Sequence, residues 1–193
     1  MPPPTLILAS TSRYRKELLT RLDLPFSCAA PGVDETPLPG EAPLATAVRL
    51  AAAKARAIQP DYDALVIGSD QVAMLDGQPL GKPGDRTTAI AQLRAQSGRE
   101  VAFHTAVCVR ATAGGRESAG VDTTVVRFRV LSEATIGRYV DLEQPFDCAG
   151  SAKSEGLGIA LLESVRTTDP TGLVGLPLIL VTSLLAAHGL AVV

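Results

Sequence analysis

The sequence predicts a mixed α/β fold with a cleft. Short apolar runs typical of buried strands alternate with amphipathic stretches typical of helices, but the alternation is irregular and hairpins occupy the middle of the chain. A regular doubly wound sheet would need strand and helix to alternate throughout. No repeat, low-complexity tract or clean linker divides the chain, so we expect residues 1–193 to form one domain.

The N-terminal part predicts a strand followed by a capped helix. Residues 5–9 form an apolar run, and Ser12 is placed to cap a helix over 13–22 whose leucines share one face. Residues 29–42 are rich in Pro and Gly and predict a loop.

A second helix is expected over 44–58, with one charged residue on its buried side. Lys54 interrupts the apolar stripe of this helix, three residues after Ala51 and four before Ile58. A lysine on a buried face is costly unless its amine reaches solvent or meets an anion. The pattern therefore predicts one of these two outcomes for Lys54.

The segment around Asp70 is the most informative in the chain. An apolar run over 64–68 predicts a buried strand, and Ser69-Asp70-Gln71 stand at its end. Asp76-Gly77 then predicts a tight turn, after which the chain reaches Lys82. A carboxylate at a strand end, with a lysine returning past a turn, is a pairing of charges that suits metal ions and anionic substrates.

The later elements follow from the same patterns. They are a helix over 87–96, strands over 101–112 and 121–130, a helix from Ser132 through Leu142, a strand over 156–162 and a helix over 178–188. No Asp, Glu, Lys or Arg occurs from Leu173 to Val193, but Gly175, Pro177 and Gly189 interrupt this stretch. We therefore expect a buried helix there rather than a membrane span.

Composition narrows the classes of function. The net charge is -2, which gives no electrostatic reason to expect nucleic-acid binding. Three widely spaced cysteines are typical of free thiols rather than of a disulfide framework, and the N-terminus lacks the basic region of a signal peptide. We therefore expect a cytoplasmic protein with no nucleic-acid or membrane partner.

One group of candidate residues lies at the first strand-to-helix junction. Ser10, Ser12 and Arg15 stand where backbone N–H groups and the helix dipole favour an anion. A guanidinium adds a planar fork that matches phosphate. An ordinary capped surface helix explains the same pattern, so both interpretations stay open at this point.

A second group consists of carboxylates and lysines. Glu35 lies in a loop, where such a residue is usually only solvated charge, while Asp70, Lys54 and Lys82 each have a structural explanation when taken alone. Taken together with a helix start that can bind an anion, however, these residues are typical of a site for metal-assisted chemistry on phosphates.

Six segments carry a resemblance to a known family, and they are spread in order over almost the whole chain. They are 8–19 (LASTSRYRKELL), 33–36 (VDET), 53–55 (AKA), 68–72 (GSDQV), 80–83 (LGKP) and 169–177 (DPTGLVGLP). These segments resemble the Maf family of nucleoside triphosphate pyrophosphatases. The resemblance implies a Maf/Ham1, ITPase-like fold, in which a mixed elongated sheet with flanking helices forms two lobes around a central cleft.

Within the family, the chain is similar to the 7-methyl-GTP pyrophosphatase branch. The dTTP/UTP branch usually has Asp-Thr at the place of Asp70-Gln71, a Gln-Gly pair at the place of 153–156 and arginine at the place of Tyr14. The implied activity is metal-dependent hydrolysis of 7-methyl-GTP to 7-methyl-GMP and pyrophosphate, which removes modified nucleotides. The alternatives are a dTTP or UTP pyrophosphatase and a non-catalytic nucleotide-binding regulator of cell division.

The resemblance also implies roles for single residues. The implied catalytic residues are Asp70, Glu35, Lys54 and Lys82. The implied substrate-binding residues are Ser10, Ser12, Arg15, Tyr14, Gln71 and Glu155, of which the last three would read the base. Asp70 and Glu35 would bind a divalent cation, Mg²⁺ or Mn²⁺.

Arg13 departs from the family pattern, which usually has proline at this place. An arginine can adopt the same helix-entry geometry and adds charge near the phosphates, so we expect tuned affinity rather than lost activity. The expected partner is a nucleoside triphosphate, and a homodimer is a further expectation because dimers are common in such folds.

Overall fold

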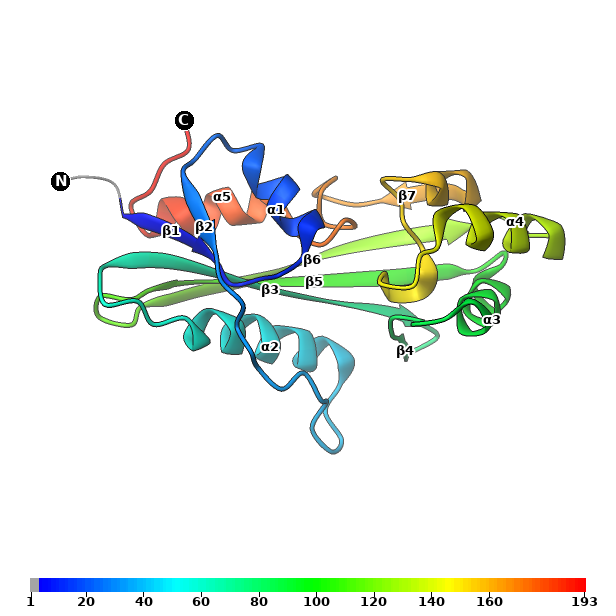
Figure 1. The fold of residues 1–193 in the computed structure, drawn as a ribbon, viewed down its shortest axis with the longest axis horizontal. Coiled ribbons are helices and arrows are strands. Elements are labelled where there is room, and N and C mark those ends of the chain that lie inside the picture. The colour runs from blue at the N-terminus through cyan, green and yellow to red at the C-terminus, as the bar shows by residue number, and fades with distance from the viewer. Residues whose placement is uncertain (1–3) are drawn as a thin grey trace. The chain divides into compact units, whose positions relative to one another are not determined.

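The computed structural model describes residues 4–193. Its strands form a seven-stranded mixed sheet in the order β2-β1-β3-β5-β6-β7, with β4 paired to β3 (Figure 1). The elements are β1 (Thr5–Leu8), α1 (Arg13–Thr20), β2 (Phe26–Cys28), α2 (Pro43–Ala57), β3 (Ala64–Leu75), β4 (Gln78–Leu80), α3 (Arg86–Gln96), β5 (Glu100–Ala111), β6 (Glu117–Phe128), α4 (Glu133–Glu143), the 3₁₀ helices η1 (Ala149–Ser151) and η2 (Leu157–Leu161), β7 (Leu162–Arg166) and α5 (Leu178–Ala187). The mixed α/β class predicted from the sequence is confirmed.

The chain divides into two compact units. The first contains the chain up to Asp70 together with Thr105–Asp122 and Asp169–Val193, and the second contains Gln71–His104 and Thr123–Thr168. Strands β3, β5 and β6 each give residues to both units. The single domain over 1–193 and its central cleft stay predictions.

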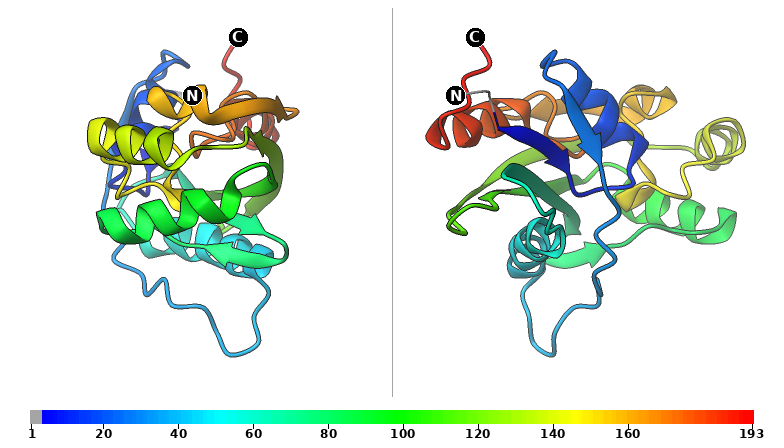
Figure 2. Two further views of the ribbon diagram at one scale, coloured as in Figure 1. Left: turned by 90° about the vertical axis from the view of Figure 1, so that its right-hand side faces the viewer. Right: turned by 60° about the vertical axis from the view of Figure 1, so that its left-hand side comes forward.

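The first unit contains three parallel strands that are covered by helices on both faces. β1 pairs in parallel with β2 and with β3, so that Leu6 lies opposite Leu65 and Leu8 opposite Ile67. Helices α1 and α5 cover one face of these strands and α2 covers the other (Figures 1 and 2). Parallel strands need both faces covered, which explains why β1 and the first half of β3 are continuous apolar runs.

Helix α2 contacts β3 through backbone atoms at Gly68. A Cβ built on Gly68 would overlap the carbonyl oxygen of Ala51 and would lie 2.6 Å from the backbone nitrogen of Ala55. Glycine is therefore required for this close approach. The approach sets the distance between Lys54, which lies between these two α2 residues in sequence, and Asp70, which lies two residues after the glycine.

Replacing this glycine is expected to destabilise the first unit. Gly68→Ala forces α2 away from β3, and we expect the free energy of unfolding to fall by about 3 kcal/mol or more, at the upper end of overpacking effects. Gly137→Ala in α4 is the matched control, since a Cβ there meets no atom within 4 Å. Denaturant unfolding of both variants checks this, and equal stabilities would contradict the role given to Gly68.

The second unit joins antiparallel strand pairs to two helices. β4 pairs with the end of β3, with Ala73 opposite Leu80, and β7 pairs with the end of β6, with Val126 opposite Val165. Helices α3 and α4 lie side by side in this unit (Figure 2). The predicted cap of α4 is confirmed, because the Ser132 hydroxyl accepts from the backbone N–H of Thr135 at 3.1 Å.

Several predicted strand boundaries were wrong, and the strand expected over 121–130, for example, is β6 over Glu117–Phe128. β3 does not end before Ser69 but continues through Leu75, so Asp70 lies inside a strand. Polar residues do not end a strand whose backbone ladder continues, as it does here through the pairing with β4. The strand expected over 156–162 is instead the 3₁₀ helix η2 followed by β7, because the N–H groups of Gly156 and Gly158 both donate to the Lys153 carbonyl and close a turn.

The C-terminal helix matches its prediction closely. α5 begins after Pro177 and ends before His188, with Gly189 in the left-handed conformation at φ +82°. Within residues 4–193, no helix is long and apolar enough to cross a membrane.

Candidate functional site

The first candidate group is the turn that leads from β1 into α1. Ser10 is only 5% exposed, and its hydroxyl accepts from the backbone N–H of Ser12 at 3.1 Å. The Ser12 hydroxyl in turn accepts from the N–H of Arg15 at 3.4 Å, which confirms Ser12 as the N-cap of α1. Two serine hydroxyls and the first N–H groups of a helix are therefore gathered in one turn, an arrangement that suits a phosphate.

Arg15 is fixed from the far end of the sequence. Its Nε donates to the carbonyl of Gly175 at 2.9 Å, and the buried Ser69 hydroxyl donates to the same carbonyl at 3.2 Å. Burial lowers the pKa of the Arg15 guanidinium, while the negative charges of Asp70 and Glu35 act in the opposite direction. Arg15 thus lies within electrostatic reach of both carboxylates.

Lys54 joins the two candidate carboxylates. Its side chain is buried, and its Nζ lies 2.7 Å from Asp70 Oδ1 and 2.7 Å from Glu35 Oε1. The side chain of Asp70 is 14% exposed and that of Glu35 is 57% exposed. Of the two outcomes predicted for Lys54, the anion is therefore the one observed, and the loop that carries Glu35 folds back onto α2 and β3 to supply it.

The carboxylate pair fits a divalent cation. Carboxylate oxygens are the ligands that Mg²⁺ prefers, and Mg²⁺ is usually held by one or two carboxylates together with waters and substrate phosphates. Asp70 and Glu35 converge on one cationic group, the Lys54 amine, so both point toward a common place where positive charge is stabilised. Nowhere in residues 4–193 do three or more His, Cys, Asp or Glu side chains gather as metal ligands.

Tyr14 and Arg13 interact with each other at the start of α1. The Arg13 guanidinium carbon lies 4.7 Å from the centre of the Tyr14 ring, and Arg13 Nη2 donates to the Tyr14 hydroxyl at 2.7 Å. The ring of Tyr14 therefore already has a cation over its face, which is the kind of contact predicted for a positively charged base.

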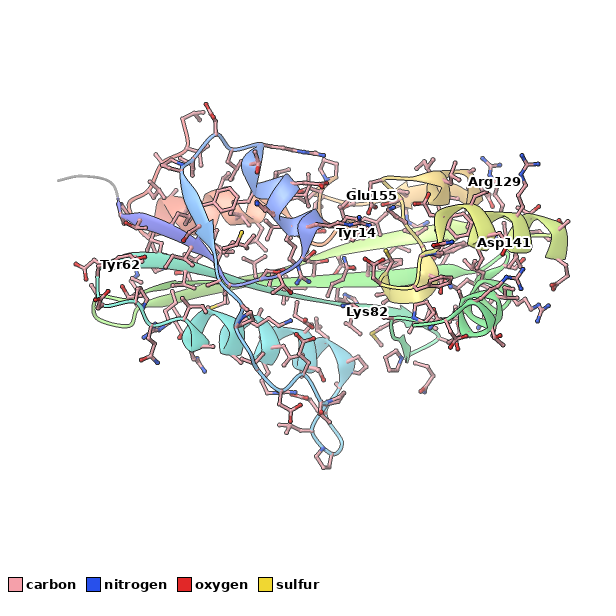
Figure 3. The ribbon with its side chains drawn as sticks, viewed as in Figure 1. Tyr14, Tyr62, Lys82, Arg129, Asp141 and Glu155 are labelled. Carbon is pink, nitrogen blue, oxygen red and sulfur yellow. The ribbon has the colours of Figure 1, made fainter. Side chains whose placement is uncertain are left out.

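The remaining predicted residues belong to the second unit. Gln71 is half-buried on β3, Lys82 is exposed between β4 and α3, and Glu155 is exposed in the turn before η2. Figure 3 labels Lys82 and Glu155. The contacts from Lys54 to Asp70 and Glu35 lie in the first unit.

Sequence reasoning missed the residues that hold Arg15 in place. Asp169 is 3% exposed and accepts from the N–H groups of Thr171 at 3.0 Å and Ile179 at 2.6 Å. These hydrogen bonds hold the loop before α5 against the start of that helix. That loop presents the Gly175 carbonyl to Arg15. The segment 169–177 was noted for its resemblance to the family, but no local pattern indicated its partner.

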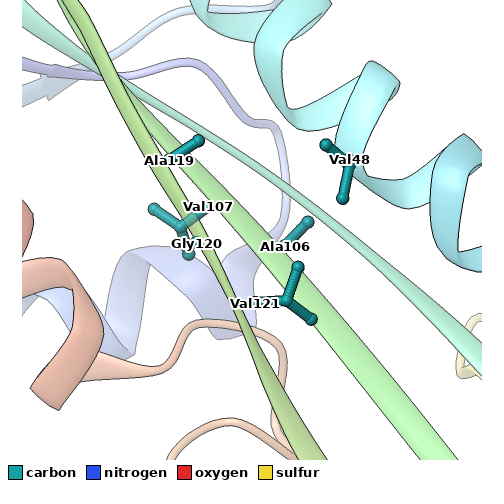
Figure 4. Close-up of a pocket in the computed structure, with 6 residues that line it drawn as sticks. All are labelled: Val48, Ala106, Val107, Ala119, Gly120 and Val121. Carbon is teal, nitrogen blue, oxygen red and sulfur yellow. The ribbon is translucent and has the colours of Figure 1, made fainter.

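A separate apolar hollow is not part of this group. It has a volume of about 140 Å³ and lies in the first unit beside α2, β5 and β6 (Figure 4). Its lining residues are Val48, Ala106, Val107, Ala119, Gly120 and Val121. No charged side chain lines it, so it offers nothing to neutralise a triphosphate.

Comparison with protein families decides the class of this chain. The model of the family described as Maf-like protein matches residues 5–188. The chain belongs to the Maf family. Among its Maf relatives, a Burkholderia pseudomallei protein named 7-methyl-GTP pyrophosphatase is 56% identical over 97% of this chain and 89% of that protein. A Thiobacillus denitrificans protein of the same name is 56% identical over 98% of this chain and 94% of that protein.

Two solved structures share a more distant likeness with this Maf protein. A nucleoside-triphosphatase, or dITP/XTP pyrophosphatase, from Mycobacterium abscessus has a TM-score of 0.40 at 17% identity and covers 66% of this chain and 75% of its own. A HAM1 protein from Coxiella burnetii has a TM-score of 0.43 at 18% identity and covers 65% of this chain and 73% of its own.

Proposed function

We propose that this Maf protein is a metal-dependent nucleoside triphosphate pyrophosphatase that hydrolyses 7-methyl-GTP to 7-methyl-GMP and pyrophosphate. The observation that carries the proposal is the buried Lys54 amine held 2.7 Å from both Asp70 and Glu35. Most ion pairs lie at the surface and contribute little to stability. A reaction at a phosphate, by contrast, needs carboxylates and cations that are fixed close together. The names of the relatives at 56% identity support the choice of substrate.

Asp70 acts on water in this proposal. Its carboxylate orients a water and accepts a proton from it as the water oxygen bonds to the α-phosphorus. The bond from that phosphorus to the oxygen bridging the α- and β-phosphates breaks, and pyrophosphate leaves with the electron pair. Lys54 fixes the orientation of Asp70, because its Nζ contacts Asp70 Oδ1.

The other cations stabilise the triphosphate. Ser10 and Arg15 bind phosphate oxygens from the start of α1, and Lys82 adds a further positive charge. Charge moves toward the leaving pyrophosphate during the reaction, so cations placed there favour the transition state over the ground state. Asp70 and Glu35 would hold Mg²⁺ or Mn²⁺, which when bound supplies Lewis-acid neutralisation of the phosphates.

Three residues read the base in this proposal. Tyr14 stacks on 7-methylguanine, whose ring carries a positive charge that an aromatic face attracts, and the base takes the ring face that Arg13 does not cover. Glu155 accepts hydrogen bonds from the N1–H and N2–H₂ edge of guanine, with Gln71 beside the base.

The proposal is tested by the release of pyrophosphate from 7-methyl-GTP, GTP, dTTP, UTP and CTP, with Mg²⁺ or Mn²⁺. We expect 7-methyl-GTP to be the preferred substrate, and we expect chelation of the metal to stop the reaction. Preference for dTTP or UTP would keep the chemistry and overturn the base-reading roles. Absence of hydrolysis for every nucleotide would favour a non-catalytic regulator of cell division.

Two variants test the base-reading residues within the same assay. Tyr14→Ala and Glu155→Gln are each expected to lower kcat/KM for 7-methyl-GTP by about tenfold or more, because each removes a contact worth about 1–2 kcal/mol. Tyr62→Ala is the control, since Tyr62 is an exposed tyrosine of the first unit outside the proposed site. Unchanged kinetics for 7-methyl-GTP in both variants would refute these two roles.

The proposed cellular setting is the cytoplasm, where removal of modified nucleotides would act as housecleaning. Cys28, Cys108 and Cys148 are all free thiols, as suits a reducing compartment. Homodimer formation is part of the same proposal and is checked by light scattering.

A further inference from the structure

Helix α4 ends beside the turn that carries Glu155, residues 153–158, which we call the Glu155 loop. Glu143, the last residue of α4, accepts from Lys153 Nζ at 2.5 Å and from the backbone N–H of Leu157 at 2.7 Å. One carboxylate therefore binds the loop on both sides of Glu155.

Backbone contacts give the Glu155 loop a compact shape. The N–H groups of Gly156 and Gly158 both donate to the Lys153 carbonyl, at 3.1 and 3.0 Å. The Tyr139 hydroxyl, one turn before Glu143 on α4, accepts from the Lys153 N–H at 3.1 Å. A Cβ on Gly156 would lie 2.6 Å from Glu143 Oε2, so only glycine lets the carboxylate approach this closely.

The ion pair between Glu143 and Lys153 is largely shielded from water. The two side chains are 10% and 20% exposed, whereas Asp141 of α4 and Arg86 of α3, which form another pair, are both 56% exposed. An exposed pair contributes little, but a shielded and hydrogen-bonded pair loses much when one partner is removed. Such a pair can fix one geometry at the cost of desolvation.

We infer that Glu143 and Lys153 are positioning residues, whose ion pair fixes the Glu155 loop and so presents the Glu155 carboxylate to the base of the nucleotide. This inference rests on the proposed function, in which Glu155 reads the base. Lys153 then controls the choice of base through the loop and not by neutralising phosphate, although a lysine near a triphosphate site would ordinarily be given that second role.

The test is the ratio of kcat/KM for 7-methyl-GTP to kcat/KM for GTP. Lys153→Met removes the ion pair and is expected to lower the ratio about tenfold, whereas Lys153→Arg keeps the charge and is expected to hold it within about threefold. The exchanged variant Glu143→Lys/Lys153→Glu restores opposite charges, so its ratio is expected to exceed that of Glu143→Lys alone. The two Lys153 variants keep the test decisive if the exchanged variant does not fold.

Asp141→Asn is the matched control, since it breaks the exposed pair two residues earlier on α4. Its ratio is expected to equal that of the wild type. The inference is overturned if Lys153→Met raises KM for every nucleotide equally and leaves the ratio unchanged, because that outcome assigns Lys153 to the phosphates.

A measurement without nucleotide separates this inference from the proposed function. In the protein alone, Lys153→Met is expected to raise hydrogen exchange at the amides of Leu157 and Gly158 about tenfold, and Asp141→Asn is expected to leave it unchanged. If the proposed function is wrong, the wild-type protein does not hydrolyse 7-methyl-GTP, whatever the exchange rates of the variants are. Failure of the proposed function and failure of this inference are therefore seen in different measurements. Unchanged exchange in Lys153→Met would refute the positioning role itself.

Discussion

Asp70→Asn is expected to lower kcat for 7-methyl-GTP by about 10³-fold, in line with the loss of a general base. The amide has the shape of the carboxylate and still accepts from Lys54, whose Nζ lies 2.7 Å from Asp70 Oδ1 in the wild type. It cannot accept a proton from water. Steady-state kinetics measure the loss, and the fold is expected to persist at the assay temperature because Glu35 still contacts the Lys54 amine.

The same variant separates catalysis from binding. A non-hydrolysable analogue of 7-methyl-GTP is expected to bind Asp70→Asn in the absence of metal about as tightly as it binds the wild type. Asp34→Asn is the control, since Asp34 lies next to Glu35 and is exposed. A variant that keeps kcat within tenfold of the wild type would exclude Asp70 as the base.

Lys54→Met is expected to have the second largest effect. The variant keeps the length of the side chain but leaves Asp70 and Glu35 without the amine that both contact. We expect kcat/KM to fall by about 100-fold or more, as for the loss of one group that stabilises the transition state. We also expect the free energy of unfolding to fall by about 2–3 kcal/mol, less than for a fully buried pair because Glu35 is 57% exposed.

Metal binding provides a readout for Lys54→Met that does not depend on activity. In the proposed site, a divalent cation would compete with the Lys54 amine for the carboxylates of Asp70 and Glu35. Mg²⁺ is therefore expected to raise the melting temperature of Lys54→Met more than that of the wild type. Lys16→Met, at an exposed lysine of α1, is expected to match the wild type in both measurements. An equal shift in all three proteins would contradict the placement of the metal at Asp70 and Glu35.

Local features of the fold could be predicted from the sequence because their partners are close along the chain. Ser12 and Ser132 cap helices through N–H groups three residues away, and both caps are present. The polar triplet after Gly68 predicts a strand end, but β3 continues through Leu75, because side-chain polarity carries no information on whether the backbone ladder continues.

The candidate site could be predicted only in part. The stripe of α2 showed that Lys54 needs solvent or an anion, but not which anion, since Glu35 comes from an irregular loop. The contact between Arg15 and Gly175 joins residues 160 positions apart and involves a backbone carbonyl, which has no sequence signature. Distant pairs of this kind are set by packing and not by local pattern.

The backbone contact at Gly68 has a consequence for which substitutions the first unit can accept. Helix α2 rests on β3 through the main chain, so no side-chain volume sets the separation between the amine and the carboxylate that it faces. Exchanges among small apolar residues elsewhere along α2 are therefore expected to leave the distance between Lys54 and Asp70 unchanged, whereas any side chain at position 68 is expected to alter it. Position 68 is thus expected to tolerate few substitutions, whereas neighbouring core positions of α2 are expected to tolerate more.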